Sequence, residues 1–289
     1  MILSNIFIYP VKSLAGIRVS QWEVVETGLK YDRQWMLIDE NGQFLSQRRF
    51  PKMALIQTEL TESTVILSAE NFSDFHLPLE PKKGAIIPST IWDDSCLAQH
   101  VSIEADAWFS AVLETVCQLV YLPSQTKRGV DLTYANDADR VAFSDGFPFL
   151  IISQNSLNSL NTELETPIEM ARFRPNLVIS GCDAYAEDFW RLIKIGDIDF
   201  RLPKPCSRCS IPAINPKTAD IEKAPLAALN RLRKWQNKIY FGQNALHNSC
   251  GKLKIGRIVE VKIVGEQSPP LPLPKIQPQI NPCVIDDLY

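Results

Sequence analysis

The chain has 289 residues, which is enough for two domains. Its hydrophobic fraction of 45% and charged fraction of 22% are those of a globular protein that buries a core without disulfide bonds. A formal net charge of -3 gives no overall attraction to nucleic acid or to an anionic membrane, so neither is an expected partner. Any anion site must therefore be a local cluster of basic residues.

The N-terminal sequence predicts a β-strand and not a signal peptide. The apolar run at 2–9 has no positively charged segment before it and no small-residue cleavage site after it. No apolar run reaches the roughly 18 residues expected of a transmembrane helix. The seven cysteines are an odd number, and without an export signal we expect most of them to be reduced. These features predict a cytoplasmic protein.

The first half of the chain is predicted to be rich in β-structure. Short apolar or alternating runs predict strands at 2–9, 19–27, 35–39, 53–60, 63–68 and 119–122. Asn41-Gly42 predicts a type I′ hairpin between two of them. A helix is predicted over 104–113, with Ala107, Trp108, Ala111 and Val112 on its apolar face.

A polar and poorly periodic segment at 123–139 marks the predicted boundary between two domains. Beyond it, strands are predicted at 149–153, 176–180, 195–202 and 257–264. Helices are predicted from an N-cap at Ser153 through residue 164 and over 225–234. Six prolines after Gln267 favour an extended tail. The predicted division is therefore 1–122, 123–266 and a proline-rich tail at 267–289.

Cys206 and Cys209 form a Cys-X-X-Cys motif with four competing interpretations. Structural zinc requires about four ligands, and the other cysteines and the histidines are scattered. A thioredoxin-like dithiol lies at a helix N-terminus, which Pro212 and Pro216 disfavour here. Two interpretations stay open: chemically inert buried cysteines, and a single thiolate that ligates a soft metal, with Arg208 favouring the thiolate form.

Three separate segments carry the basic residues that a local anion site would need, and they are Lys12-Ser13, Asp32-Arg33 and 172–176. In isolation each would be a solvated or ion-paired surface group. If several converge, arginine can bind phosphate or the edge of a planar heterocycle through paired hydrogen bonds. The loop Ser144-Asp145-Gly146 is a further candidate, because its amides and carboxylate match the polar edge of a pterin-like ring.

Taken in chain order, several blocks resemble the MOSC family, named for the molybdenum cofactor sulfurase C-terminal domain. The blocks at 8–13 (Ile-Tyr-Pro-Val-Lys-Ser) and 31–35 (Tyr-Asp-Arg-Gln-Trp) resemble the β-barrel domain that precedes a MOSC domain. The blocks that resemble the MOSC domain itself are 173–181, 206–209, 240–243 and 253–256. The ordered set spans about residues 1–264. It is similar to the subgroup with the mitochondrial amidoxime-reducing component and the bacterial proteins that detoxify hydroxylaminopurines.

The resemblance implies an α+β, β-rich fold in two domains, namely an N-terminal β-barrel-like domain and a C-terminal MOSC β-barrel with flanking helices. It also implies a molybdenum–molybdopterin cofactor between them. Cys209 falls on the molybdenum-ligating position, and is the implied catalytic residue, whereas Cys206 matches a non-ligating one. The implied cofactor contacts are Lys12, Ser13 and Arg33 at the phosphate, Arg174 and Asn176 at the pterin, and Arg48, Ser144, Asp145 and Gly146 in cofactor-facing loops.

Three departures from the family pattern stand out. Asn215-Pro216-Lys217-Thr218-Ala219 replaces a frequent Asp-Pro-X-Thr-Gly, and Gly146-Phe147 replaces small hydroxyl residues. The C-terminal ferredoxin domain of some bacterial relatives has no counterpart, because the proline-rich tail carries one cysteine, Cys283. No iron–sulfur cluster of that kind is therefore expected.

The implied activity is molybdenum-dependent reduction of N-hydroxylated compounds, such as hydroxylamines, amidoximes or N-hydroxylated purines. The implied electron donor is a separate flavoprotein or ferredoxin-type protein. Detoxification and pyridoxal phosphate binding are two further properties that the resemblance associates with the family. One alternative is a carrier of molybdenum cofactor or sulfur without turnover of its own, which the altered Asn215 segment keeps open. The other is a zinc or thiol protein built on Cys206 and Cys209.

Overall fold

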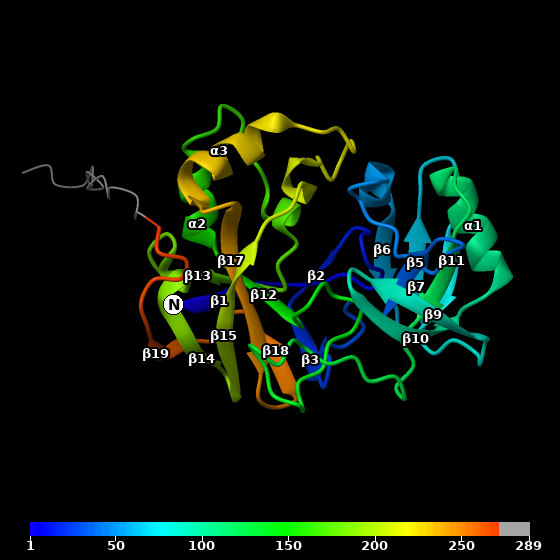
Figure 1. The fold of residues 1–289 in the computed structure, drawn as a ribbon, viewed down its shortest axis with the longest axis horizontal. Helices are drawn as coiled ribbons and strands as arrows, with labels where there is room; N and C mark the ends of the chain where they lie inside the picture. Colours follow the sequence, from blue (N-terminus) through cyan, green and yellow to red (C-terminus); the bar gives the residue numbers. More distant parts are fainter. Residues whose placement is uncertain (272–289) are drawn as a thin grey trace, which may run out of the picture.

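The computed structural model describes residues 1–271, which form two lobes with separate hydrophobic cores (Figure 1). We call residues 35–122 the N-terminal lobe and the rest of the described chain the C-terminal lobe. Trp35 and Phe109 are fully buried in the core of the first, and Phe200 is fully buried in the core of the second. The β-rich α+β fold predicted from the sequence is confirmed.

A nine-stranded sheet forms the body of the C-terminal lobe. Its order is β19-β14-β15-β17-β12-β13-β1-β2, with β16 beside β17, and the only parallel pair among these described strands is β12 with β13. The strands are β1 (Ile2–Ile8), β2 (Ile17–Val19), β12 (Phe149–Ser153), β13 (Leu177–Ser180), β14 (Trp190–Ile195), β15 (Ile198–Ser207), β16 (Lys234–Trp235), β17 (Lys238–His247) and β19 (Val259–Val264).

This sheet curls until its far edge meets β1 again. The backbone N–H of Leu3 donates to the carbonyl of Arg257 at 2.9 Å, and the N–H of Val259 donates to the carbonyl of Met1 at 3.1 Å. A bridge between Ile2 and Ile258 lies between these bonds. The sheet therefore closes into a barrel, as the resemblance implied for this half of the chain.

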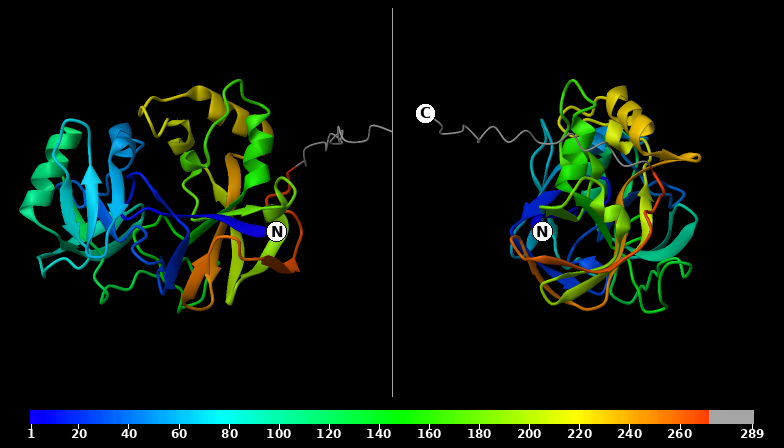
Figure 2. Two further views of the ribbon diagram at one scale, coloured as in Figure 1. Left: turned by 180° about the vertical axis from the view of Figure 1, so that it is seen from behind. Right: turned by 90° about the vertical axis from the view of Figure 1, so that its left-hand side faces the viewer.

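Alternating side chains of the central strands separate two cores. Ile151 and Ile179 point into the barrel cluster, whereas their neighbours Ile152 and Val178 join a second cluster under the helices. The helices are α2 (Gln154–Asn161) and α3 (Lys223–Arg233). Both lie on the same side of the sheet (Figure 2). Strands buried on both faces read as apolar runs, which is why this region was predictable from sequence.

Helix α2 begins where the sequence predicted but ends earlier. The Ser153 hydroxyl accepts from the N–H of Ser156 at 3.1 Å, which confirms the N-cap of α2. The helix ends at Asn161 and not at residue 164, because the Asn161 side chain bonds both the N–H and the carbonyl of Ile168 and turns the chain back. A smaller three-stranded sheet flanks the barrel, formed by β18 (Gly251–Lys254), β3 (Gln21–Val25) and β4 (Gly28–Leu29).

The N-terminal lobe contains two smaller sheets and one helix. The first sheet has the order β5 (Trp35–Ile38), β11 (Gln118–Tyr121), β10 (Asp94–His100) and β9 (Ile86–Ile91), and the second has β6 (Gln57–Leu60), β7 (Thr64–Ser68) and β8 (Phe75–Pro78). Helix α1 (Ile103–Leu113) covers the outer end of the lobe (Figure 1). Short one-turn helices are η1 (Pro51–Leu55), η2 (Met170–Phe173), η3 (Ala186–Phe189) and η4 (Ile211–Ala213).

Three local predictions in the first half were wrong. The buried face of α1 is Ala105, Phe109 and Leu113, because Phe109 and Leu113 fill the core of the lobe, whereas Trp108 stays partly exposed and donates to the carbonyl of Ser73. The turn at Asn41-Gly42 is not type I′, because only Gly42 has a positive φ. Residues 51–55 form η1 and not the start of a strand, because Pro51 begins a helical turn.

Strands β1 to β4 precede residue 122 in sequence but are paired within the C-terminal lobe. The exact division at 122/123 stays a prediction. The predicted extended tail at 267–289 falls largely outside the described residues. Among the described helices, none is both long and apolar enough to cross a membrane.

A buried acidic pair lies beneath α2 and α3. Asp188 receives a hydrogen bond at 2.7 Å from Arg233, and each side chain is 1% exposed. Gln243 donates to the same carboxylate at 2.9 Å. The neighbouring Glu187 accepts from the Ser156 hydroxyl at 2.7 Å instead of from a cation. Burial and the adjacent Asp188 charge raise the pKa of Glu187 from 4.5 to about 7.

We predict that Glu187 makes the protein less stable as the pH rises from about 4.5 to about 7. The folded-state pKa lies above the unfolded value, so the contribution is complete below pH 4.5 and is lost as the pH rises through about 7. The shift corresponds to at most about 3 kcal/mol. Urea unfolding measures the free energy of unfolding. The value for Glu187→Gln minus that for the parent should therefore increase as the pH rises. The control is Glu163→Gln, at an exposed position. If the difference in free energy of unfolding from the parent does not change with pH for either variant, the assignment is contradicted.

Candidate functional site

A cleft opens between the lobes, with about 860 Å³ of space that includes the solvent at its mouth. Every residue that the resemblance assigned to the cofactor or the metal lines it, namely Lys12, Ser13, Arg33, Arg48, Ser144, Asp145, Gly146, Arg174, Asn176 and Cys209. The structure thus brings together segments that lie far apart in the chain. Residues that line the cleft but were not singled out include Phe44, Trp92 and Asn244.

The backbone topology explains why these segments converge. Strands β1 and β13 are antiparallel, with Ile6 opposite Leu177. The end of β1 therefore lies beside the beginning of β13. Lys12, a few residues after β1, and Arg174, a few residues before β13, are brought to the same edge of the sheet. Arg33 joins them because its N–H donates to the carbonyl of Tyr9 at 2.7 Å.

Asp32 and Asn176 hold these segments together behind the cleft wall. One Asp32 oxygen accepts from the N–H of Tyr9 at 2.8 Å, and the other accepts from Arg33 at 2.5 Å and from Asn176 at 3.0 Å. The side-chain oxygen Oδ1 of Asn176 accepts from the N–H of Leu150 at 3.2 Å. Asn176 is 2% exposed, and both the oxygen and the nitrogen of its side-chain amide are hydrogen-bonded within the protein. In this structure it braces the wall of the cleft.

The basic wall is formed by Arg33 and Arg174. Arg33 donates to the carbonyl of Arg174 at 3.1 Å, and Arg174 donates to the carbonyl of Leu14 at 2.6 Å. Burial, together with the nearby Arg33 charge, lowers the pKa of Arg174 to about 10. A guanidinium shifted in this way gains from any anion that approaches it.

Lys12 and Asp145 form an ion pair in the cleft, with Nζ and Oδ1 separated by 2.5 Å. Burial lowers the pKa of Lys12, whose side chain is 7% exposed. For Asp145, desolvation raises the pKa, but the charge and hydrogen bond of Lys12 outweigh it and hold the pKa well below its usual range. Asp145 is therefore a carboxylate near neutral pH and a hydrogen-bond acceptor only.

Arg128 was not identified from the sequence, although it fixes the loop that carries Asp145. It is 5% exposed and donates to the carbonyls of Ala142 at 2.8 Å and Ser144 at 2.5 Å. Its second nitrogen contacts Asp94 at 2.7 Å. Lys12 holds the same loop from the cleft side through the carbonyl of Phe143 at 2.8 Å. Two cations thus clamp the loop before Gly146.

The two cysteines lie where strand β15 leaves the sheet. This strand continues to Ser207, beyond the predicted end at 202, so Cys206 is its penultimate residue and Cys209 follows it. Both are partly buried and line the cleft, which contradicts the interpretation of inert core cysteines. A short η4 turn follows instead of an α-helix, as the prolines predicted. Residues 1–271 contain no group of three or more His, Cys, Asp or Glu side chains arranged to hold a metal.

Arg208 contacts Cys206 and not Cys209. Its Nη1 lies 3.1 Å from the Cys206 sulfur, and its Nη2 donates to the carbonyl of Phe173 at 2.8 Å. The remaining donor, Nε, is buried without a partner within the described chain. The contact that the sequence predicted between Arg208 and Cys209 is therefore made with the neighbouring Cys206.

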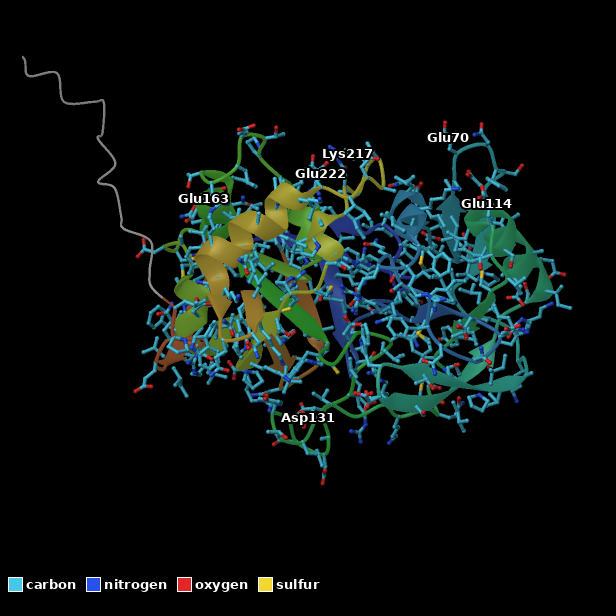
Figure 3. All side chains as sticks on the ribbon, turned by 45° about the horizontal axis from the view of Figure 1, so that its top comes forward. Glu70, Glu114, Asp131, Glu163, Lys217 and Glu222 are labelled. Carbon is cyan, nitrogen blue, oxygen red and sulfur yellow. The ribbon has the colours of Figure 1, made fainter. Side chains whose placement is uncertain are left out.

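The departure at 215–219 leaves the loop ordered. The Asn215 oxygen accepts from the N–H of Lys217 at 3.0 Å, and its amide nitrogen donates to Glu222 at 2.8 Å. Ala219 has a φ of 63°, the left-handed conformation that favours glycine, which the family often has there. Lys217 and Glu222 lie on the side of the C-terminal lobe that faces the other lobe (Figure 3). Pro216 and Lys217 line a neighbouring cavity and not the main cleft.

Two known families cover most of the chain. The MOSC N-terminal beta barrel domain matches residues 1–116, and the MOSC domain matches residues 138–260. Together they account for both sides of the cleft.

Curated relatives resemble the chain over most of its length. Mitochondrial amidoxime-reducing component 1 of Homo sapiens is 33% identical over 280 residues, which cover 88% of this chain and 81% of that protein. The Mus musculus protein of the same name is 32% identical over 273 residues, covering 88% and 80%. Molybdenum cofactor sulfurase of Solanum lycopersicum is 32% identical over 267 residues, covering 83% of this chain but 32% of that protein. This chain therefore belongs to the MOSC family, as a MOSC N-terminal beta barrel domain followed by a MOSC domain.

Proposed function

We propose that this chain binds a molybdenum cofactor in the cleft and reduces N-hydroxylated compounds there. The observation that carries the proposal is the meeting of a cysteine thiol, Cys209, with a strongly cationic wall in one cleft. Relatives named for amidoxime reduction and for molybdenum cofactor sulfuration support it. The electron donor in this proposal is a separate flavoprotein or ferredoxin-type protein.

The residues present fit an anionic cofactor. Among the residues that line the cleft, five are cationic and one is a carboxylate, and the cations are Lys12, Arg33, Arg48, Arg174 and Arg208. Because Asp145 is paired with Lys12, most of this positive charge has no partner among the lining carboxylates. A phosphate group would balance it through charge-assisted hydrogen bonds. The unpartnered Nε of Arg208 adds a buried donor beside the cysteines.

Each part of the cleft has a distinct role in the proposal. Lys12, Ser13 and Arg33 would hold the phosphate end of the cofactor. Arg174, which lies beside Arg33 on the Tyr9 ring, would reach both the phosphate and the pterin, and the 144–146 loop would face the pterin. The Cys209 thiolate would ligate the metal, since thiolates suit soft, higher-valent metals. When bound, a molybdenum cofactor supplies two electrons that, with two protons, convert an N–OH group to N–H and water.

The remaining lining residues shape access for the substrate. Trp92 and Phe147 also line the cleft and supply apolar surface, so a flat and uncharged compound would gain more there than a cationic one. Arg48 lies over the Trp92 ring, 4.0 Å from its centre, and stiffens this edge. Asp145, held as a carboxylate, accepts hydrogen bonds and does not supply the protons of the reaction.

A carrier function without turnover is the second candidate. The similarity to molybdenum cofactor sulfurase, which extends over 83% of this chain, favours it. In this role the same cleft would hold the cofactor for transfer, and Cys209 would have no part in reducing a substrate.

We predict that Cys209→Ser loses molybdenum while Cys206→Ser and Cys182→Ser retain it. Loss of a metal ligand should exceed the roughly tenfold loss of affinity that changes outside the ligand shell already cause. Molybdenum would be measured by mass spectrometry, and pterin by fluorescence, on protein from a cofactor-competent host. Because the cations stay in place, pterin should fall less than molybdenum. Full molybdenum in Cys209→Ser would refute the ligand assignment.

A second experiment distinguishes catalytic turnover from a carrier function. The loaded parent protein, given a chemical electron donor, should convert an amidoxime to an amidine and a hydroxylamine to an amine, at a rate proportional to its molybdenum content. Product formation would be followed by chromatography, with Cys209→Ser as the inactive comparison. Fully loaded protein that forms no product supports the carrier function instead.

A further inference from the structure

The two arginines of the cationic wall share a single aromatic ring. The guanidinium carbon of Arg33 lies 4.1 Å from the centre of the Tyr9 ring, and that of Arg174 lies 4.3 Å from it. Both distances are well inside the roughly 6 Å range of a cation–π interaction. Arg33 precedes β5 and Arg174 precedes β13, so the ring joins two distant parts of the chain.

Hydrogen bonds and close packing fix the position of the Tyr9 ring. Its hydroxyl donates to the carbonyl of Pro175 at 3.1 Å, and the N–H of Tyr9 donates to Asp32 at 2.8 Å. Tyr9 is 2% exposed. Glycine is needed at position 16, because a Cβ there would lie 2.3 Å from the Cε1 atom of the ring. The position of the ring is therefore set by its surroundings and not by the arginines.

Two guanidiniums so close together repel each other, and only Arg33 has a carboxylate partner, at Asp32. Arg174 donates only to a main-chain carbonyl among its described contacts. The negative face of an aromatic ring attracts both cations without neutralising either of them. Burial raises the pKa of Tyr9 to about 12, so the ring stays uncharged and neutralises neither arginine. The charge that remains is available to a ligand.

We propose that Tyr9 is a positioning residue, which holds Arg33 and Arg174 together as one grip for a phosphate group in the cleft. The identity of the phosphate as part of a cofactor rests on the proposed function, whereas the grip itself rests on the geometry. Tyr9 acts through the arginines and does not contact the ligand. Without the ring, the guanidiniums would separate, and each would bind the anion alone.

The test uses the full chain without cofactor and inorganic phosphate as the probe, with affinity measured by calorimetry. Tyr9→Leu removes the ring, and Gly16→Ala displaces it while every cleft residue is kept. Both should bind phosphate about tenfold more weakly, as loss of two cation–π contacts implies. Tyr9→Phe keeps the ring and should stay within about threefold of the parent. Phe109→Leu, a buried change in the N-terminal lobe, controls for lost stability and should bind phosphate like the parent.

The outcomes separate this proposal from the proposed function. Parental affinity in Tyr9→Leu or Gly16→Ala overturns the positioning role, as does a parent that binds no phosphate. A Tyr9→Phe variant as weak as Tyr9→Leu also overturns it, because the hydroxyl and not the ring would then matter. A parent that needs the ring for phosphate but takes up no molybdenum in a competent host refutes the proposed function alone. If Tyr9→Leu does not fold, Gly16→Ala decides the question.

Discussion

Pairing of the first strand with the C-terminal sheet determines where the site forms. Strand β1 lies between β13 and β2, and its first residues also close the barrel against residues 257–259. Since β1 ends where β13 begins, the chain after one strand and the chain before the other meet at a single edge. The cleft is thus a product of the topology of the sheet. A domain drawn as a continuous stretch of sequence would separate the two halves of this edge.

Buried polar contacts then fix the edge in place. Asp32 accepts hydrogen bonds from three residues that come from both halves of the chain, and Arg128 and Lys12 hold the opposite loop. Each of these contacts satisfies a main-chain group or a charge that burial would otherwise leave unpaired. The cleft is therefore formed by rigid, hydrogen-bonded segments, and preorganised groups of this kind bind a ligand with little loss of conformational entropy.

Much of the fold and the site followed from the sequence where local signals were strong. The doubly buried strands β12 and β13, the Ser153 cap and the ordered basic blocks all have short-range signatures. Of these, the blocks supply Lys12, Arg33 and Arg174 to one cleft. Strand β17 escaped prediction because its pairing with β15 shifts register twice and its pattern does not alternate.

Other features depend on tertiary contacts that no spacing reveals. Arg128 sits in a polar segment that resembles a surface linker, and its burial is defined only by the carbonyls of a loop folded over it. The contact of Arg208 with Cys206 depends on how the chain turns after β15. The cofactor contacts stay a prediction, because the residues that line a cleft do not by themselves identify the ligand that binds in it.

The placement of β1 also has a consequence for how the protein is made. Ile2 is paired with Ser180, so strand β1 leaves the ribosome long before its partner β13 is synthesised. Long-range pairings of this kind slow folding and leave strand edges exposed in the meantime. During that interval the nascent segment at 2–8, which is mostly apolar, would expose surface that the folded sheet buries.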